Sequence, residues 1–176
     1  MIYNPEEDSY LLRSLIKRYS KNKSVLDLGS GSGIQALEAL KHKASNVSAS
    51  DIDEESLTHL KTIKNLKVIK SDLFNNISDS FDLIIFNPPY LPENKLEDKQ
   101  TSRITTGGKK GDEIILRFLE QSKDHLNKNG TILLLLSSLT PKSKIKTLLK
   151  KQKMKHKPLA KKEIFMETLE VWEITN

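Results

Sequence analysis

The stretch "SVLDLGSGSG" (residues 24–33) decides the fold class, because an apolar run leads directly into a glycine-rich turn. The run "SVLDLG" has the length and composition of a buried strand. Gly29, Gly31 and Gly33 permit a tight turn and let a ligand approach the backbone. Their G-x-G-x-G spacing differs from the G-x-G-x-x-G of the dinucleotide-binding fingerprint. Such a turn alone is weak evidence for a site, so the flanking segments must decide what it serves.

Strand-sized apolar runs alternate with helical patterns on both sides of this stretch, which is typical of βαβ units and a parallel sheet. The predicted strands cover residues 24–29, 46–51, 66–72, 81–87, 131–138 and 166–175, with a further strand near 153–160. The predicted helices cover residues 34–42 and 112–126, with one helix that Asp53 caps, one that Pro141 opens, and a long loop over residues 91–110. We therefore expect an α/β fold: a doubly wound, mostly parallel, Rossmann-like seven-stranded sheet with a C-terminal antiparallel hairpin, in a single domain spanning residues 1–176.

The segment "NPEE" near the N-terminus predicts the start of another helix. Asn4 is a suitable N-cap and Pro5 suits the first helical position. Glu7 stands where the reciprocal partner of a capping box belongs.

Composition is that of a globular protein, with 36% hydrophobic and 30% charged residues in a chain of 176. No apolar run approaches the roughly 18 residues that a membrane span needs, and the N-terminus lacks the pattern of a signal peptide. Because there is no cysteine, we expect neither a disulfide framework nor a thiolate metal site. We expect a cytoplasmic enzyme or binding domain without a metal centre.

Positive charge is concentrated between Pro141 and Lys162, where there are ten lysines and no acid. The formal net charge is +6, so the rest of the chain sums to −4 (6 − 10). One interpretation is a surface for nucleic acid or the ribosome. The other is a solvated lysine-rich helix and connector, which the absence of interleaved aromatic residues favours.

Carboxylates follow the first three predicted strands, at the positions where doubly wound folds bind ligands. Asp27 and the glycines end the first strand, and Asp51 lies 22 residues beyond Gly29, near the spacing at which an acid meets ribose hydroxyls. Asp72 could accept a hydrogen bond from an adenine amino group, with Leu73 against the ring. No Walker lysine follows the glycines, and Asp27 would repel phosphate but favour an ammonium or sulfonium. Adenine, ribose and a cationic tail together describe S-adenosylmethionine.

The fourth predicted strand ends in Asn87-Pro88-Pro89-Tyr90. The prolines fix their own φ and bias the preceding residues to extended geometry. The Asn87 amide oxygen and a proline carbonyl are acceptors, and Tyr90 offers a flat wall. This rigid corner suits a planar substrate that carries an –NH2 group.

These motifs resemble those of a known family. "VLDLGSGSG", "SDID", "SDLF" and "NPPY", in this order and spacing, are similar to those of class I S-adenosylmethionine-dependent methyltransferases. The start "YNPEEDSYLL" and the later "TGGKKGDEIILRFL" narrow the resemblance to HemK-type protein-(glutamine-N5) methyltransferases, which modify the Gly-Gly-Gln glutamine of class I translation release factors. Bacterial members carry an additional N-terminal helical domain. This chain begins at "PEEDS" and so resembles the short archaeal and eukaryotic branch, which works with a small zinc-binding activator subunit.

The resemblance implies roles for particular residues. The positions expected to bind the cofactor S-adenosylmethionine are Ser9, Asp27, Gly29, Gly31, Gly33, Asp51, Ile52, Asp72, Leu73 and Asn87. The catalytic substrate corner is expected at Asn87, Pro88, Pro89 and Tyr90, with Gly107, Gly108 and Gly111 forming the glycine loop beyond it. Residues 91–106 carry no family pattern, which leaves the choice of substrate open. The activator is expected to dock on an apolar sheet edge.

Three alternatives to a glutamine substrate stay open from the residues themselves. The first is an adenine-N6 methyltransferase acting on RNA or DNA, because the exocyclic amine of adenine is also a planar –NH2 group. The lysine-rich segment would then contact the nucleic acid backbone. A protein-lysine methyltransferase would gain less from the neutral Asn87. A non-catalytic subunit of the same fold would not need Asp27, Asp51, Asp72 and Asn87 together. His42, His59, His125 and His156 form no cluster in sequence and are assigned no role.

Overall fold

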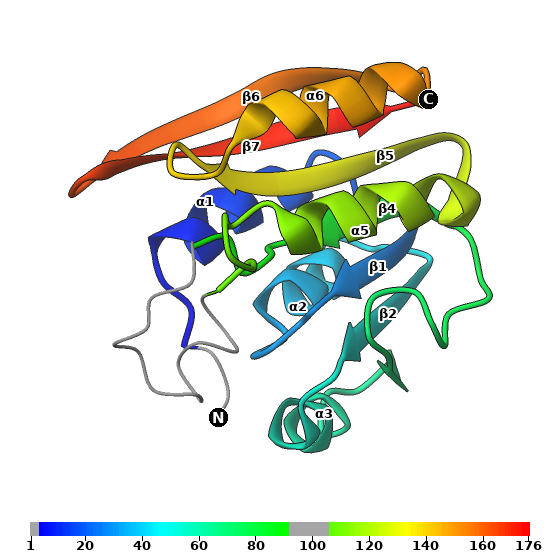
Figure 1. Ribbon diagram of the computed structural model, residues 1–176. Coiled ribbons are helices and arrows are strands. Elements are labelled where there is room, and N and C mark those ends of the chain that lie inside the picture. The colour runs from blue at the N-terminus through cyan, green and yellow to red at the C-terminus, as the bar shows by residue number, and fades with distance from the viewer. Residues whose placement is uncertain (1–3, 92–105) are drawn as a thin grey trace.

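The computed structural model describes residues 4–91 and 106–176, which fold around a seven-stranded sheet (Figure 1). The strand order is β3-β2-β1-β4-β5-β7-β6. The strands are β1 (Ser24–Leu28), β2 (Asn46–Asp51), β3 (Leu66–Lys70), β4 (Phe81–Phe86), β5 (Leu126–Ser137), β6 (Lys155–Ile164) and β7 (Glu167–Thr175). Strands β1 to β5 pair in parallel, whereas β7 is antiparallel to both β5 and β6. The predicted doubly wound sheet with its final hairpin is confirmed.

Helices cover both faces of this sheet. They are α1 (Glu7–Ile16), α2 (Ile34–Lys41), α3 (Glu54–Leu60), α5 (Glu113–Ser122) and α6 (Lys142–Lys151), with a 3-10 turn at Lys123–His125. Buried side chains of α1, α2 and α3 form one hydrophobic cluster with the sheet, and those of α5 and α6 belong to a second cluster on the other face. The alternating strand-sized and helix-sized apolar patterns therefore correspond to three layers, with helices on both faces of one sheet.

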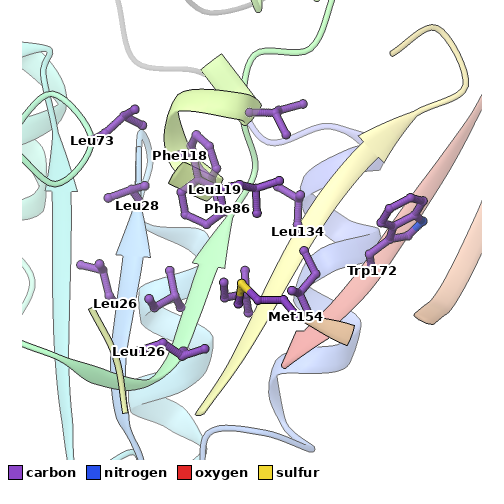
Figure 2. Packing of buried hydrophobic residues seen from close by; sticks show 14 of the residues in the cluster. Leu26, Leu28, Leu73, Phe86, Phe118, Leu119, Leu126, Leu134, Met154 and Trp172 are labelled. Atoms are coloured by element: carbon purple, nitrogen blue, oxygen red, sulfur yellow. The ribbon is translucent and has the colours of Figure 1, made fainter. Parts of the chain in front are cut away.

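The second cluster is centred on aromatic rings and leucines from β1, β4, β5 and α5 (Figure 2). The rings of Phe86 and Phe118 lie 4.6 Å apart, and Phe118 is fully buried. Full burial of such a side chain contributes about 1.5–3 kcal/mol to folding. Phe86 is the last residue of β4, so this packing fixes the strand end from which Asn87 projects.

The predicted start of the first helix is wrong. The helix begins at Glu7, with Glu6 in extended geometry as its N-cap and no side-chain cap, so neither Asn4 nor Pro5 is helical. The first turn is stabilised instead by its own acids, since Glu7 and Asp8 lie at the positive end of the helix. The carboxylate Oδ1 of Asp8 also accepts a hydrogen bond from the backbone N–H of Ser9, 2.5 Å away.

Several other boundaries differ by a few residues. β5 begins five residues earlier than predicted, at Leu126, where it pairs with the start of β4. The hairpin partner of β7 covers Lys155–Ile164 rather than residues 153–160. The predicted loop over residues 91–110 lies mostly outside the described residues, although a bridge joins Leu91 to Thr106. In the part of the chain that the structure describes, no helix is long and apolar enough to cross a membrane.

Candidate active site

The carboxyl ends of the parallel strands meet along one rim of the sheet. Leu28, the last residue of β1, pairs with Ser50 of β2 and with Phe86, the last residue of β4. Asp51 ends β2 next to Lys70, the last residue of β3. The registers therefore bring the loops after β1, β2, β3 and β4 to the same rim, which is where ligands bind in this class of fold.

The glycine-rich turn after β1 is held in place by β2. The backbone N–H of Gly31 donates a 2.8 Å hydrogen bond to the Asp51 carboxylate, and the backbone N–H of Ser30 donates to the Ser50 carbonyl. Gly33 has a φ of 75°, and a Cβ there would lie 2.8 Å from Leu60 Cδ2. Both the backbone conformation and the packing therefore disfavour a side chain at Gly33. Contacts within the protein therefore hold the turn in this conformation.

Asp27 lies beneath this turn and is 2% exposed. Its Oδ2 accepts a 3.0 Å hydrogen bond from the backbone N–H of Ala36, in the first turn of α2. Burial raises the pKa of Asp27 to about 7, an effect that the Ala36 hydrogen bond opposes and the nearby Asp51 charge reinforces. A cationic group that bound here would restore the ionised carboxylate.

The two other predicted cofactor carboxylates differ in how much they are already engaged. Asp51 Oδ1 accepts hydrogen bonds from the backbone N–H groups of Ile52 and Asp53, at 2.7 and 2.9 Å. Asp72 is 40% exposed and forms a 2.8 Å ion pair with Arg117 of α5. Arg117 was missed by the sequence analysis, because nothing along the chain links α5 to the loop after β3.

Two apolar residues flank these carboxylates. Ile52 is 64% exposed directly after Asp51. Leu73 is buried and has a φ of 49°, an uncommon left-handed conformation for a leucine. An exposed apolar side chain and a strained one beside the same rim suit contact with a planar apolar ligand group.

Asn87 is held by the first turn of α1. Its Nδ2 donates a 3.0 Å hydrogen bond to Asp8 Oδ2, and Ser9 Oγ lies 3.4 Å from the same nitrogen. The amide oxygen, Oδ1, is buried and accepts no hydrogen bond. Asp8, which is 5% exposed, therefore sets which face of the amide points away from α1. The family resemblance predicts a role for Ser9 but not for Asp8, although both residues stand in "PEEDS".

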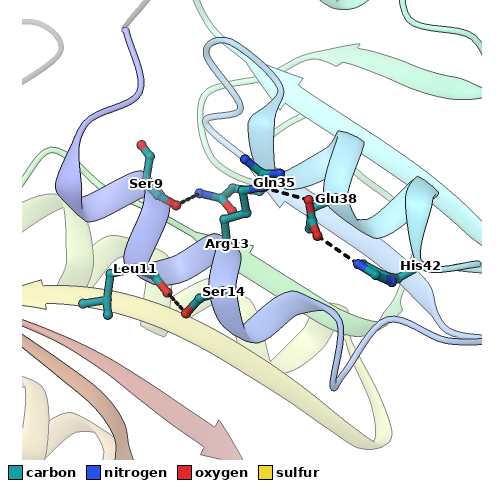
Figure 3. A network of polar contacts seen from close by, with 7 residues as sticks. All are labelled: Ser9, Leu11, Arg13, Ser14, Gln35, Glu38 and His42. Carbon is teal, nitrogen blue, oxygen red and sulfur yellow. Dashed lines mark hydrogen bonds and ion pairs between the residues drawn. The ribbon is translucent and has the colours of Figure 1, made fainter.

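A polar network fixes α1 against α2 and so supports this contact (Figure 3). Gln35 Nε2 donates a 3.0 Å hydrogen bond to the Ser9 carbonyl. Farther along the two helices, Glu38 pairs with both Arg13 and His42 at 2.8 Å. These bonds hold the first turn of α1 beside the end of β4, although 78 residues separate Ser9 from Asn87.

The rest of the proline corner is packed and uncharged. Pro88 is buried and Tyr90 is half-buried, between the two hydrophobic clusters. Burial raises the pKa of Tyr90, and the carboxylates of Asp8, Glu167 and Glu6 raise it further. Tyr90 therefore stays neutral at physiological pH and is suited to be a wall rather than a base.

The glycine loop lies directly against this corner. The backbone N–H of Gly107 donates a 2.9 Å hydrogen bond to the Leu91 carbonyl. A Cβ at Gly107 would lie 2.6 Å from the carbonyl oxygens of both Pro89 and Gly111, so only glycine allows this approach. The structure thus brings Gly107 against the proline corner.

The four histidines form structural contacts and no cluster. His59 Nε2 lies 3.2 Å from the Ser32 carbonyl oxygen of the glycine-rich turn, and His42 pairs with Glu38. His125 stacks on Phe74 and His156 on Trp172, each with ring centroids 4.5 Å apart. Within residues 4–91 and 106–176, no group of three or more His, Cys, Asp or Glu side chains could hold a metal ion.

The arrangement fits a cationic nucleoside ligand together with an amide substrate. A buried carboxylate lies under a glycine turn, two further carboxylates follow the neighbouring strands, and the orphaned Asn87 oxygen lies at the next strand end. A buried acceptor without a donor costs about 1–3 kcal/mol, which a bound N–H group would recover.

Comparisons with known proteins also indicate a methyltransferase. The model of the methyltransferase small domain family matches residues 7–166. A Methanocaldococcus jannaschii protein, provisionally assigned as a protein N5-glutamine methyltransferase, is 37% identical over 147 residues, which cover 79% of this chain and 74% of that protein. The release factor glutamine methyltransferase of Lactococcus lactis is 31% identical over 76% of this chain, which spans about half (54%) of that relative's length.

One solved structure matches the fold along nearly its whole length. It is the E. cuniculi Mtq2–Trm112 complex, responsible for methylation of the translation termination factor eRF1. Its similarity to this chain has a TM-score of 0.80 with 27% sequence identity, and it covers 98% of this chain and 97% of the matched chain.

Proposed function

Because this chain belongs to the methyltransferase small domain family, we propose that it transfers a methyl group from S-adenosylmethionine to a side-chain amide nitrogen. The substrate is the glutamine of the Gly-Gly-Gln motif in a class I translation release factor, in keeping with the named activities of its relatives. The observation that carries this proposal is the buried, unpartnered Asn87 Oδ1 at the end of β4.

The residues that would hold the cofactor are those at the strand ends. Asp27 would accept from its ammonium, Asp51 from ribose hydroxyls and Asp72 from the adenine amino group. Ile52 and Leu73 would contact the apolar faces of the base, and Gly29, Gly31, Gly33 and Ser9 would shape the turn and the wall around it. When bound, the cofactor supplies a methyl group on a sulfonium that is already a good leaving group.

The chain's own task is to prepare the nucleophile, because an amide lone pair is delocalised into the carbonyl. Asn87 Oδ1 and the Pro88 carbonyl would accept hydrogen bonds from the substrate –NH2 and orient its lone pair. The same acceptors stabilise the positive charge that develops on nitrogen as the new bond forms. Holding the reacting atoms in line can contribute several kcal/mol more.

Asp8 fixes the orientation of the Asn87 amide in this mechanism. Since Asn87 Nδ2 donates a 3.0 Å hydrogen bond to Asp8 Oδ2, a flip of the amide would place Asn87 Oδ1 against the carboxylate oxygen. The neutral Tyr90 ring would stack on the substrate amide plane. No residue is needed as a strong base, because the nitrogen becomes acidic once it is methylated.

We also propose that a small zinc-binding activator subunit forms a heterodimer with this chain, as the relative from E. cuniculi is found with Trm112. The sheet has two edges, β3 and β6. Strand β6 is mostly exposed and lysine-rich, although Leu159, Ala160 and Ile164 are half-buried. In the shorter β3, Leu66, Val68 and Ile69 are half-buried beside the exposed Lys67 and Lys70. The β3 edge is therefore the more apolar of the two and suits such a partner better. Full activity and a monodisperse state for the chain alone would refute the need for an activator.

The substrate proposal is tested with labelled S-adenosylmethionine and an intact release factor, with and without its Gly-Gly-Gln glutamine changed to alanine. We expect label on the unchanged factor only. Label on both factors would indicate another acceptor such as lysine, and label on RNA or DNA in parallel reactions would favour adenine. Because translation termination is cytoplasmic, a release-factor substrate would place the reaction in the cytoplasm. We propose that residues 1–176 carry it out as one domain.

A further inference from the structure

The tip of the β6–β7 hairpin presents two large apolar side chains to water. Ile164 and Glu167 form the last pair of the hairpin, so Phe165 and Met166 alone make the turn. Phe165 is 91% exposed and Met166 is 83% exposed, more than any other large hydrophobic residue in the described part of the chain. Single exposed apolar residues are ordinary, but an adjacent pair at a projecting turn is not.

The turn itself is unfavourable for this sequence. Two-residue hairpin loops favour glycine, asparagine or aspartate, because one or both central residues take a positive φ. Here Met166 has a φ of 66°. A left-handed conformation costs a bulky residue about 1–2 kcal/mol. Since Phe165 and Met166 serve neither the turn nor the core, a role outside the fold is the remaining explanation.

The tip lies on the same rim as the catalytic corner. Leu169 of β7 pairs with Ser137, the last residue of β5, so the hairpin continues past the carboxyl end of β5. Figure 1 shows this tip projecting on the side where β5 ends and α1 begins. Glu167, beside the tip, is close enough to Tyr90 for its charge to raise the pKa of the phenol. An ion pair between Lys162 and Glu7 ties the hairpin to the first turn of α1.

We propose that the hairpin tip, residues 164–167, docks an apolar surface of the protein substrate next to the Asn87 corner. This inference rests on the proposed function, because a glutamine on a folded release factor cannot reach Asn87 without the factor's body contacting the rim. Glu163 and Glu167 flank the apolar pair. The nearest lysines, Lys161 and Lys162, are already ion-paired with Glu170 and Glu7. The tip therefore offers no free cation to nucleic acid phosphates or anionic lipids, which favours a protein surface as the occupant.

A double substitution, Phe165→Asn with Met166→Gly, tests the proposal. Asn-Gly is the preferred sequence for a two-residue hairpin turn, so the hairpin should be kept while the apolar surface is removed. We expect KM for the intact release factor to rise at least tenfold, with kcat and the Kd for S-adenosylmethionine unchanged. The activator subunit is present in all reactions if the wild-type chain needs it.

Leu37→Ser is the matched control, because Leu37 is a 46% exposed apolar side chain on α2. It should leave KM for the release factor unchanged. An unchanged KM in the double variant, or an equal rise in the control, overturns the docking role. A wild-type dimer that the double variant converts to a monomer, seen by sedimentation, would also overturn it by assigning the tip to a contact between copies. Failure of the wild-type enzyme to methylate the release factor would refute the proposed function itself. That outcome is distinct from a negative result in the KM comparison, which needs an active wild-type enzyme.

Discussion

Replacing Asn87 by alanine removes the acceptor on which the proposed chemistry depends. The substitution deletes the buried Oδ1, which accepts no hydrogen bond in the structure, and the Nδ2 group that donates to Asp8 at 3.0 Å. The first loss acts only when a substrate amide is bound. The second acts on the folded protein at all times, so the two effects can be measured separately.

The expected magnitudes follow from these two contacts. Loss of one preorganised hydrogen-bonding group in an active site lowers kcat by about 10²–10³-fold. Loss of the Nδ2 donor to the buried Asp8 carboxylate should lower the free energy of unfolding by about 1–3 kcal/mol. The Kd for S-adenosylmethionine should change by less than about tenfold, because the interaction is realised mainly in the transition state.

Asn127→Ala supplies a matched control for the stability effect. Asn127 Nδ2 also donates a 3.0 Å hydrogen bond to a carboxylate, that of Asp82, but at the amino end of β5. Single-turnover methylation of the release factor and urea unfolding would be measured for both variants. We expect similar losses of stability in the two proteins and a loss of turnover only in Asn87→Ala.

Turnover within about threefold of wild type in Asn87→Ala would refute the reasoning, whatever the stability result. An equal fall of kcat in Asn127→Ala would also refute it, because the loss would then come from general destabilisation. A large rise in the Kd for S-adenosylmethionine, with normal turnover at saturation, would make Asn87 a cofactor residue only.

The remaining predictions concern the glycine turn and the carboxylate beneath it. Because burial raises the pKa of Asp27 to about 7, the folded protein holds this proton more tightly than the unfolded chain does. The proton therefore contributes at most roughly 4 kcal/mol to the free energy of unfolding. This contribution is complete below about pH 4 and is lost as the pH rises to 7. Asp27→Asn should flatten this pH dependence in urea unfolding of the cofactor-free protein and should abolish the gain in cofactor affinity expected between pH 6 and 8; an unchanged pH profile would contradict the assignment. Gly33→Ala should cost about 1–3 kcal/mol of stability, because its φ is 75° and a Cβ would lie 2.8 Å from Leu60. Gly29→Ala, with a φ of 62° but its nearest contact at 3.6 Å, should cost less in the same thermal unfolding assay, and the reverse order would count against the packing argument.

Much of the fold could be predicted because its signals are local. Continuous apolar runs in β1, β4 and β5 indicate strands buried on both faces, and glycines or asparagines punctuate their ends. The N-cap of α3 was predicted correctly, since Asp53 accepts a hydrogen bond from the Ser56 backbone N–H three residues on. The start of α1 was predicted wrongly, since Glu6 rather than Asn4 is the N-cap and no side chain caps the helix.

The sequence by itself determined which residue types follow each parallel strand, since strand ends and turn residues are written in short stretches of chain. It therefore predicted Asp27, Asp51, Asp72 and Asn87 as neighbours along one rim. Only the tertiary structure decided how these groups are engaged: that Asp8 holds Asn87, that Arg117 pairs with Asp72, and that burial shifts the pKa of Asp27. Each of these effects depends on segments that are distant in the chain or on the exclusion of water from one polar side chain. A local pattern can indicate that a strand is buried, but it does not show which distant residues meet there.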